Sequence, residues 1–246
     1  MLRINMNLDM HLGDRVLALS ILNDVTKLND VEFDIYGGDN PQLLELVEGC
    51  DKLHMHLENY TGVDPIYNTW CGNYKFSFEP FGRVGFENGI IEYFKYLFSN
   101  IINVPMNCDI GEFVISFDSV NNFRKLEHIG NIDYLFINSD ACSGQLCNSS
   151  KDVIFTNQIN THAINGDVVW CTKRVNGLHP SVKVTTDYNY TLRDIAELSI
   201  YSKNIISVGT SPILCCMNIH NINKNIVIYE NCNIHLWLGN SKNVRI

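Results

Sequence analysis

The sequence predicts an α/β protein with two similar halves, because strand-like and helix-like segments alternate along most of the chain. In the first half, residues 2–6, 31–36 and 52–56 have the pattern of short strands separated by helices. In the second half, residues 132–138 have the pattern of a buried strand that opens another alternating series. A strand–helix–strand order implies parallel strands joined by helical crossovers. Polar loops at strand ends in both halves predict a ligand cleft between two domains.

The first strand leads into a glycine and an acid, Gly13 and Asp14, at the start of a long helix. Apolar residues recur at helical spacing from Val16 to Leu28. Gly13 allows the backbone to approach a ligand closely, and a carboxylate near a helix N-terminus is stabilised in its ionised form. The pair is equally well explained as a turn residue and a helix cap. Pro41 is expected to open the second helix, because proline suits a first helical turn.

The segment from residue 60 to residue 107 is less regular and is rich in aromatic residues, with glycine and proline among them. Within it, residues 90–102 have the pattern of an apolar helix. The segment is either a cover for the hydrophobic core or an insertion that binds an acceptor. Residues 113–117 are either a further strand or the bridge between the two domains.

The second half continues with four short strands, at residues 168–172, 182–185, 204–208 and 226–229. An amphipathic helix is expected over residues 191–198, with Thr191 as its N-cap and Asp194 at the capping-box position. Polar loops follow two strands, at residues 139–144 and 209–211, and Pro212 opens the next helix.

The composition favours a folded, acidic protein with one large or two small domains. Hydrophobic residues make up 46% of the 246 residues, which is enough for a full core. A net charge of -9 and a pI of about 5.3 argue against a protein whose main ligand is a phosphate backbone. We see neither a signal peptide nor an apolar run of membrane-spanning length, so we expect a cytoplasmic protein without membrane insertion. Abundant asparagine suggests an AT-rich microbial or phage genome.

Several residues that often carry chemistry have a structural explanation here. The nine cysteines contain no CxxC pair, which favours reduced thiols over a zinc site, and Cys215 and Cys216 are expected in the core. His54 and His56 share one face of a strand, where a surface or cleft-edge role is favoured over a metal site. The sequence lacks a nucleophile elbow, a Walker A motif and a dinucleotide fingerprint, which disfavours hydrolases, NTPases and dehydrogenases.

Two stretches resemble a known family. Residues 4–28, with Leu-Gly-Asp at residues 12–14 and the helix after it, resemble the opening of heptosyltransferase-type glycosyltransferases. Residues 187–217 resemble the helix, strand and threonine-containing loop of that family's donor site, with the loop at residues 209–211. Together the two stretches cover about a quarter of the chain, in the order and separation that the family shows.

The resemblance implies the GT-B fold, in which two Rossmann-like domains face a cleft. It assigns residues 1–125 to an N-terminal acceptor domain and residues 126–246 to a C-terminal nucleotide-sugar domain. In the first domain it makes Asp14 the general base that takes the proton of the acceptor hydroxyl. Gly13 and His11 are then the expected contacts to the acceptor. Because neither half contains an Asp-x-Asp pair in a metal-binding context, we expect no obligatory metal or cofactor.

The resemblance also implies a donor site in the second domain. Backbone N–H groups at the start of the Pro212 helix are expected to hold the leaving diphosphate, and they belong to Gly209, Thr210 and Ser211. Further donor contacts are expected from Ser139, Lys173 and Arg174, although the two cations are equally well explained as solvated surface charges. The chain departs from the family where Gly209 replaces an acidic residue and where a histidine is missing at or near Leu214.

These features predict a glycosyltransferase that moves a sugar from a nucleotide-sugar to a hydroxyl acceptor with inversion at the anomeric carbon. The acceptor is either a glycan or a hydroxylated base in DNA. The main alternative is a non-catalytic protein that binds a nucleotide or nucleotide-sugar on the same fold, which the missing acid at Gly209 favours. A sugar-nucleotide epimerase is a third possibility, but its cleft would need more acidic and histidine residues than we can place.

Overall fold

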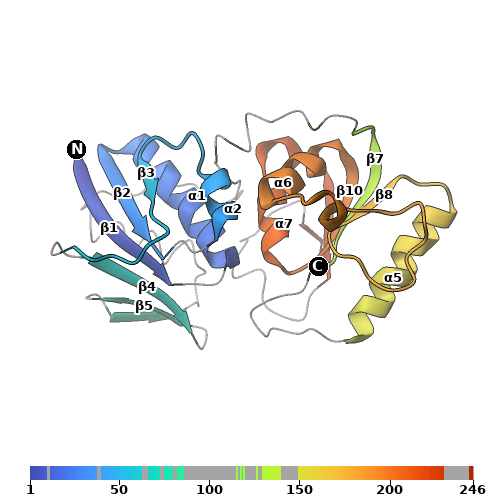
Figure 1. Ribbon diagram of the computed structural model, residues 1–246, viewed down its shortest axis with the longest axis horizontal. Coiled ribbons are helices and arrows are strands. Elements are labelled where there is room, and N and C mark those ends of the chain that lie inside the picture. Colours follow the sequence, from blue (N-terminus) through green and yellow to red (C-terminus); the bar gives the residue numbers. More distant parts are fainter. Residues whose placement is uncertain are drawn as a thin grey trace. The chain divides into compact units, whose positions relative to one another are not determined.

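The structure of the 246-residue chain is a computed structural model (Figure 1). It describes residues 1–9, 12–37, 40–62, 66–72, 75–79, 82–85, 115, 117, 119, 126, 129–139, 149–229 and 244–245. These residues fall into two compact units. Residues up to 119 belong to the first unit, and the described residues from 126 onward belong to the second. The expected domain boundary at residues 125 and 126 stays a prediction.

The first unit is built on a six-stranded sheet with the order β3-β2-β1-β4-β5-β6. Its strands are β1 (Leu2–Asp9), β2 (Val31–Tyr36), β3 (Leu53–Met55), β4 (Ile66–Gly72), β5 (Lys75–Glu79) and β6 (Gly82–Gly85). The pairings from β3 to β4 are parallel, whereas β5 and β6 continue the sheet in antiparallel pairs. Helices α1 (Leu12–Leu28) and α2 (Pro41–Leu46) lie on the same side of this sheet (Figure 1).

The two faces of the first sheet differ in polarity because β1 alternates apolar and polar residues. Ile4 and Met6 are buried and stand in register with the buried Phe33 and Ile35 of β2. The opposite face carries Arg3, Asn5 and Asn7, in register with Glu32, Asp34 and Tyr36. Because successive side chains of a strand point to opposite faces, the apolar set forms the core and the polar set gathers on the other face.

The second unit also has a six-stranded sheet, with the order β12-β11-β10-β7-β8-β9, and its described pairings are parallel. Its strands are β7 (Ile132–Ile137), β8 (Val169–Cys171), β9 (Lys183–Val184), β10 (Ser202–Val208), β11 (Asn225–Tyr229) and β12 (Val244–Arg245). The helices are α5 (Ser149–Ile164), α6 (Leu192–Tyr201) and α7 (Ser211–Cys216), with short 3-10 turns η2 (Thr185–Tyr188) and η3 (Ile219–Asn221).

Helices cover both sides of the second sheet, with α5 on one side and α6 and α7 on the other (Figure 1). Phe155, Ile159 and Ala163 recur at helical spacing on α5 and pack against Phe136 and Val169 of the sheet. A parallel sheet covered on both faces needs apolar residues on both, which explains the nearly continuous apolar run of β7. No helix in the described ranges is long and apolar enough to cross a membrane.

Most expected elements of regular structure are present, with ends that move by one to three residues. The capping box of α6 is confirmed: the Thr191 N–H donates to Asp194 Oδ2 at 2.8 Å, and the Asp194 N–H donates to Thr191 Oγ1 at 3.4 Å. Pro41 opens α2, behind an Asn40 cap. The sequence analysis did not identify α5, whose apolar residues are interrupted by polar ones.

The expectation of irregular structure from residue 60 to residue 107 was wrong for part of that segment, which contributes β4, β5 and β6 to the first sheet. Glycine and proline break the segment into short strands, and the cross-strand pairing that joins them is not visible in a linear pattern. The helix expected over residues 90–102 lies outside the described residues. Of residues 113–117, Ile115 and Phe117 are described, and both are buried and outside strands.

Candidate functional site

The strand order of each sheet marks one end of its central strand as a candidate binding site. From β1 the chain adds β2 and β3 on one side and then returns to place β4 on the other. In the second unit, β8 and β9 are added on one side of β7, and β10 on the other. Open α/β sheets bind ligands at the carboxyl ends of their strands where the strand order reverses in this way. The candidate sites are therefore the loops after β1 in the first unit and after β7 and β10 in the second.

Gly13 and Asp14 lie where the sequence placed them, in the first turn of α1 after β1. A carboxylate in this turn interacts favourably with the partial positive charge of the helix N-terminus. Both residues are buried, and the exposed fraction of Asp14 is 0%. His11 lies outside the described residues.

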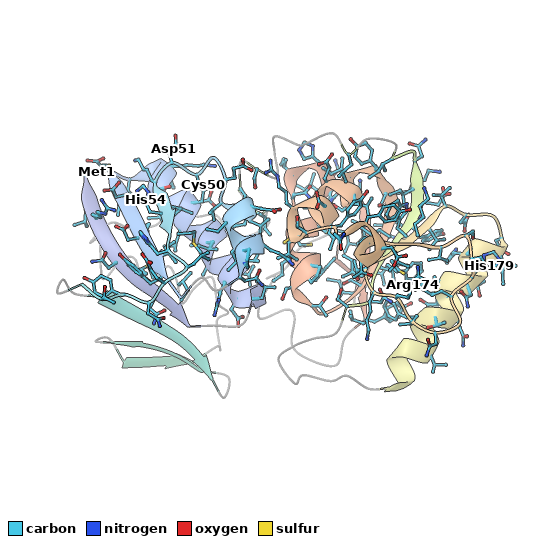
Figure 2. The ribbon with its side chains drawn as sticks, in the orientation of Figure 1. Met1, Cys50, Asp51, His54, Arg174 and His179 are labelled. Carbon is cyan, nitrogen blue, oxygen red and sulfur yellow. The ribbon has the colours of Figure 1, made fainter. Side chains whose placement is uncertain are left out.

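The two histidines of the first unit share a sheet face, as predicted, and each binds a carboxylate of the neighbouring strand. His54 Nε2 donates to Glu32 Oε2 at 3.2 Å, and His56 Nε2 donates to Asp34 Oδ1 at 2.8 Å. His54 is labelled in Figure 2. Because a carboxylate only accepts, the Nε2 atom of each ring carries the hydrogen of these bonds. Within the described residues no group of three or more potential ligands could hold a metal ion.

A guanidinium completes this polar face. Arg3 binds Asp34 with two hydrogen bonds, from Nε to Oδ2 and, at 2.7 Å, from Nη2 to Oδ1. The hydrogen bonds from Arg3 lower the pKa of Asp34 to about 2, although burial of the carboxylate opposes this shift and the bond from His56 adds to it. The Tyr36 ring stacks on His56, with ring centroids 4.5 Å apart. These contacts hold the imidazole in one orientation.

In the second unit, Asn138 joins the loops that follow β7 and β8. Its Oδ1 accepts the backbone N–H groups of Thr172 at 3.1 Å and Lys173 at 2.8 Å, and its Nδ2 donates to the Lys173 carbonyl oxygen at 3.0 Å. Ser139, an expected donor contact, donates through Oγ to Thr172 Oγ1 at 2.7 Å. The sequence analysis missed Asn138 and Thr172 as functional residues, although each directly follows a strand.

Arg174, labelled in Figure 2, follows this joined pair of loops and forms an ion pair with Asp187 of η2. Its Nε donates to Asp187 Oδ1 at 3.2 Å, and its Nη2 donates to Asp187 Oδ2. Hydrogen bonding to Arg174 lowers the pKa of Asp187, and that carboxylate raises the pKa of Arg174. An anion that approaches Arg174 therefore meets a carboxylate already in place.

The loop after β10 places Thr210 as the N-cap of α7, with extended backbone angles. Its side chain does not cap the helix, and its buried Oγ1 makes no hydrogen bond with any described residue. Buried hydroxyl groups normally have a partner, so this one keeps a hydrogen-bonding capacity that no described residue uses. On the same short helix, Cys215 and Cys216 are buried as expected, and burial raises both thiol pKa values, that of Cys216 to about 12.

The fold has close counterparts among solved structures. The E. coli heptosyltransferase WaaC with ADP-2-deoxy-2-fluoro heptose superposes with a TM-score of 0.59 at 9% identity, over 99% of this chain and 92% of WaaC. The chain has the heptosyltransferase fold. A glycosyl transferase family 9 protein from Veillonella parvula gives a TM-score of 0.57 at 12% identity, over 94% of this chain and 82% of that one.

A third structure with the heptosyltransferase fold is larger than this chain. The iron-containing dodecameric glycosyltransferase TibC from enterotoxigenic E. coli gives a TM-score of 0.58 at 12% identity, over 92% of this chain. The match spans 57% of the length of TibC. No family model and no curated protein matches the sequence itself. At these identities the likeness is one of fold, so the predicted resemblance to heptosyltransferases is confirmed at that level.

Proposed function

We propose that this chain is a glycosyltransferase that uses a nucleoside-diphosphate sugar. The observation that carries the proposal is the buried, unpartnered Thr210 hydroxyl within the described residues, at the strand-order reversal of a sheet with the heptosyltransferase fold. The second unit binds the donor and the first unit binds the acceptor.

The donor diphosphate binds at the loop after β10. Thr210 Oγ1 donates to a phosphate oxygen, together with backbone N–H groups of Gly209, Thr210 and Ser211. The neighbouring loops contribute Ser139, Lys173 and Arg174. Donors fixed before binding stabilise the charge that grows on the leaving diphosphate without reorganising during the reaction.

Asp14 accepts the proton in the transfer step. The acceptor oxygen attacks the anomeric carbon from the face opposite the diphosphate, the carbon–oxygen bond to the diphosphate breaks, and the bonding pair leaves with it. The acceptor proton passes to the Asp14 carboxylate, and the anomeric centre inverts. Because Asp14 is 0% exposed, binding of the acceptor must open a path to this carboxylate. The acceptor is a glycan or a hydroxylated DNA base, and the net charge of -9 favours the glycan.

A non-catalytic protein that binds a nucleotide or nucleotide-sugar is the second candidate. The burial of Asp14 favours it, because a base without accessible surface takes no proton from a substrate. Gly209, at the position where the family has an acid, favours it as well.

A thermal-shift screen with ADP, UDP, GDP, CMP and their sugar conjugates tests the donor site. ADP comes first because WaaC structures with this fold contain ADP or an ADP-heptose analogue. A ligand that binds only the folded state raises the melting temperature. We expect a selective shift that Thr210→Val reduces and Thr161→Val retains. Thr161 is the matched control, because its exposed hydroxyl donates to the Asn157 carbonyl within α5.

Release of diphosphate from the selected sugar conjugate then separates the two candidates. Turnover supports the transferase, and protection of the conjugate without turnover supports the binding protein. A chain that shifts with none of these compounds contradicts both.

A further inference from the structure

The Arg174–Asp187 pair lies at the same end of the second sheet as the donor loops. Arg174 is three residues beyond the end of β8, and Asp187 is three residues beyond the end of the neighbouring parallel strand β9. The exposed fractions of the two side chains are 60% and 41%, so a ligand in solution can reach both. Their opposite charges cancel at the point where the proposed function requires a cation for a diphosphate.

Contacts that do not involve Arg174 hold Asp187 in place. Thr185, at the start of η2, donates through Oγ1 to the Thr172 carbonyl oxygen at 3.2 Å, which ties η2 to the β8 loop. Tyr188 and Tyr190 pack on the buried Trp170, with ring centroids 5.3 and 5.8 Å from it. The carboxylate therefore stays near Arg174 when another anion binds there.

Asn189 allows both tyrosines to reach Trp170. This residue ends η2 and adopts a left-handed conformation with φ of 55°. Among the described residues other than glycine, no other has a positive φ. Asparagine tolerates this conformation better than most residues. Its backbone N–H donates to the Thr186 carbonyl oxygen at 3.3 Å, which closes the turn that carries Asp187.

Among the described contacts of Arg174, Asp187 is the carboxylate that binds its guanidinium. Lys173 is adjacent to Arg174 in sequence, and the Lys183 ammonium lies 5.2 Å from the centroid of the Trp170 ring. Cys171 is buried with its pKa raised to about 12, so the thiol adds no charge near neutral pH. With Lys173 next to Arg174 in sequence, removal of the Asp187 carboxylate changes the local charge in favour of an anion.

We propose that Asp187 is an affinity-determining residue that competes with the diphosphate for Arg174 and so weakens its binding. The inference rests on the proposed function, because it places the diphosphate at the β8 and β10 loops. A nucleoside diphosphate released from its sugar gains a negative charge, so the competition acts most strongly on the product. Asp187 thereby limits retention of the product at the cost of some affinity for the donor.

The test is calorimetric titration of the intact chain with ADP at low and at physiological salt. Asp187→Asn keeps the side-chain shape, and we expect it to tighten ADP binding by up to about fivefold at low salt, which is the upper range for an exposed ion pair. The gain shrinks at higher salt because exposed charges are screened. Arg174→Gln is expected to weaken ADP binding, and Asp187→Asn added to it is expected to give no further gain.

Asp133→Asn is the matched control. Asp133 pairs with Lys203 at 2.6 Å in the same unit, with 25% of the Asp133 side chain exposed, and the pair lies at the opposite, amino-terminal ends of the strands, in β7 and β10. This variant is expected to leave ADP affinity unchanged. The sign of the Asp187→Asn effect separates competition from a structural role, because loss of a structural contact weakens binding.

The outcomes distinguish this inference from the proposed function. ADP binding that Asp187→Asn leaves unchanged or weakens overturns the inference and leaves the donor site in place. An equal gain in the Arg174→Gln background also overturns it, because the competition then does not act through Arg174. If neither the wild type nor Asp187→Asn binds ADP or any other diphosphate of the screen, the proposed donor site and the inference fall together.

Discussion

The two units share one arrangement of strands but carry different side chains at their candidate sites. Each has a six-stranded sheet in which the strand order reverses beside a central strand. In the first unit the charged groups are paired across a sheet face, as in Arg3 with Asp34, and the candidate base Asp14 is buried. In the second unit the candidate site combines the exposed Arg174–Asp187 pair with the buried Thr210 hydroxyl, which lacks a partner among the described residues.

This difference indicates a division of labour. A carboxylate in the first turn of a helix suits proton transfer once an acceptor reaches it, whereas hydroxyl and backbone N–H groups suit an anion, which they bind without carrying charge themselves. The shared plan positions a site in each unit, and the side chains after the strands decide its chemistry. The following predictions test this contrast, starting with the largest expected effect.

Asp14→Asn tests whether the first unit supplies the base. We expect the rate of diphosphate release to fall by about a factor of 10² to 10⁴, because the amide does not take a proton. The thermal shift with the donor is expected to persist, since the proposed function places the donor on the other unit. A variant that retains the wild-type rate with intact donor binding excludes Asp14 as the base.

Asn138→Ala tests the loops of the second unit. The N–H groups of Thr172 and Lys173 and the Lys173 carbonyl lose their partner, so we expect the free energy of unfolding to fall by about 2 to 3 kcal/mol. Urea denaturation measures this change. Asn157→Ala, at an exposed position of α5, is the control and is expected to stay within about 0.5 kcal/mol of the wild type. Equal stability of the two variants contradicts the role given to Asn138.

Asp34 tests the paired charges of the first unit through acid stability. Its pKa of about 2 lies below the usual 3.8, so the unfolded chain binds the proton first as the pH falls. The stability from this carboxylate is therefore present above pH 4 and is lost as the pH falls towards 2. Because the Asp34 side chain is only 3% exposed, solvent screens the interaction little, and its contribution to the free energy of unfolding is about 2 kcal/mol.

Denaturation at several pH values measures the effect of Asp34. The slope between pH 4 and 2 is expected to be smaller in Asp34→Asn than in the wild type. Arg3→Gln is expected to reduce the slope as well, because hydrogen bonds from Arg3 are the largest cause of the low pKa. If both variants keep the wild-type slope, the pairing does not stabilise the folded state.

The smallest expected effect concerns a feature that both units share. Lys52 donates to the Thr26 and Asn29 carbonyl oxygens at the end of α1, and Lys224 donates to those of Ser199 and Ile200 near the end of α6. Lysine at a helix C-terminus interacts favourably with the helix dipole. We expect Lys52→Met to lower the free energy of unfolding by up to about 1 kcal/mol at neutral pH, whereas in Lys224→Met relief of the buried ammonium offsets the lost interaction.

The pH dependence distinguishes the two lysines. Burial lowers the pKa of Lys224 from 10.5 to about 8, so the unfolded chain binds more protons between these values. Deprotonation of Lys224 therefore raises the free energy of unfolding of the wild type as the pH rises from 8 towards 10.5. Lys224→Met lacks this increase. Identical pH profiles for the wild type and Lys224→Met contradict the burial of the ammonium group.

The sequence by itself determined the α/β class and the elements that have strong local signals. Thr191 and Asp194 predicted the start of α6, and Pro41 and Pro212 predicted the starts of two short helices. These signals are readable because they depend on residues within one helical turn. Gly13 and Asp14 were singled out because they follow a strand and open a helix, and Thr210 because its loop resembles the donor site of heptosyltransferases.

Only the tertiary structure decided which of these residues bind each other. The strands β4 to β6 were not predicted, because their antiparallel pairing depends on contacts between residues of different strands and leaves no local pattern in the sequence. Asn138 with Thr172, and Arg174 with Asp187, are 34 and 13 residues apart in sequence, so no local pattern joins them. Likewise, the burial of Asp14 follows from packing around α1, and the sequence gives no measure of it. Spacing along the chain therefore located the candidate sites, and contacts across the sheets determined the charge and accessibility of their side chains.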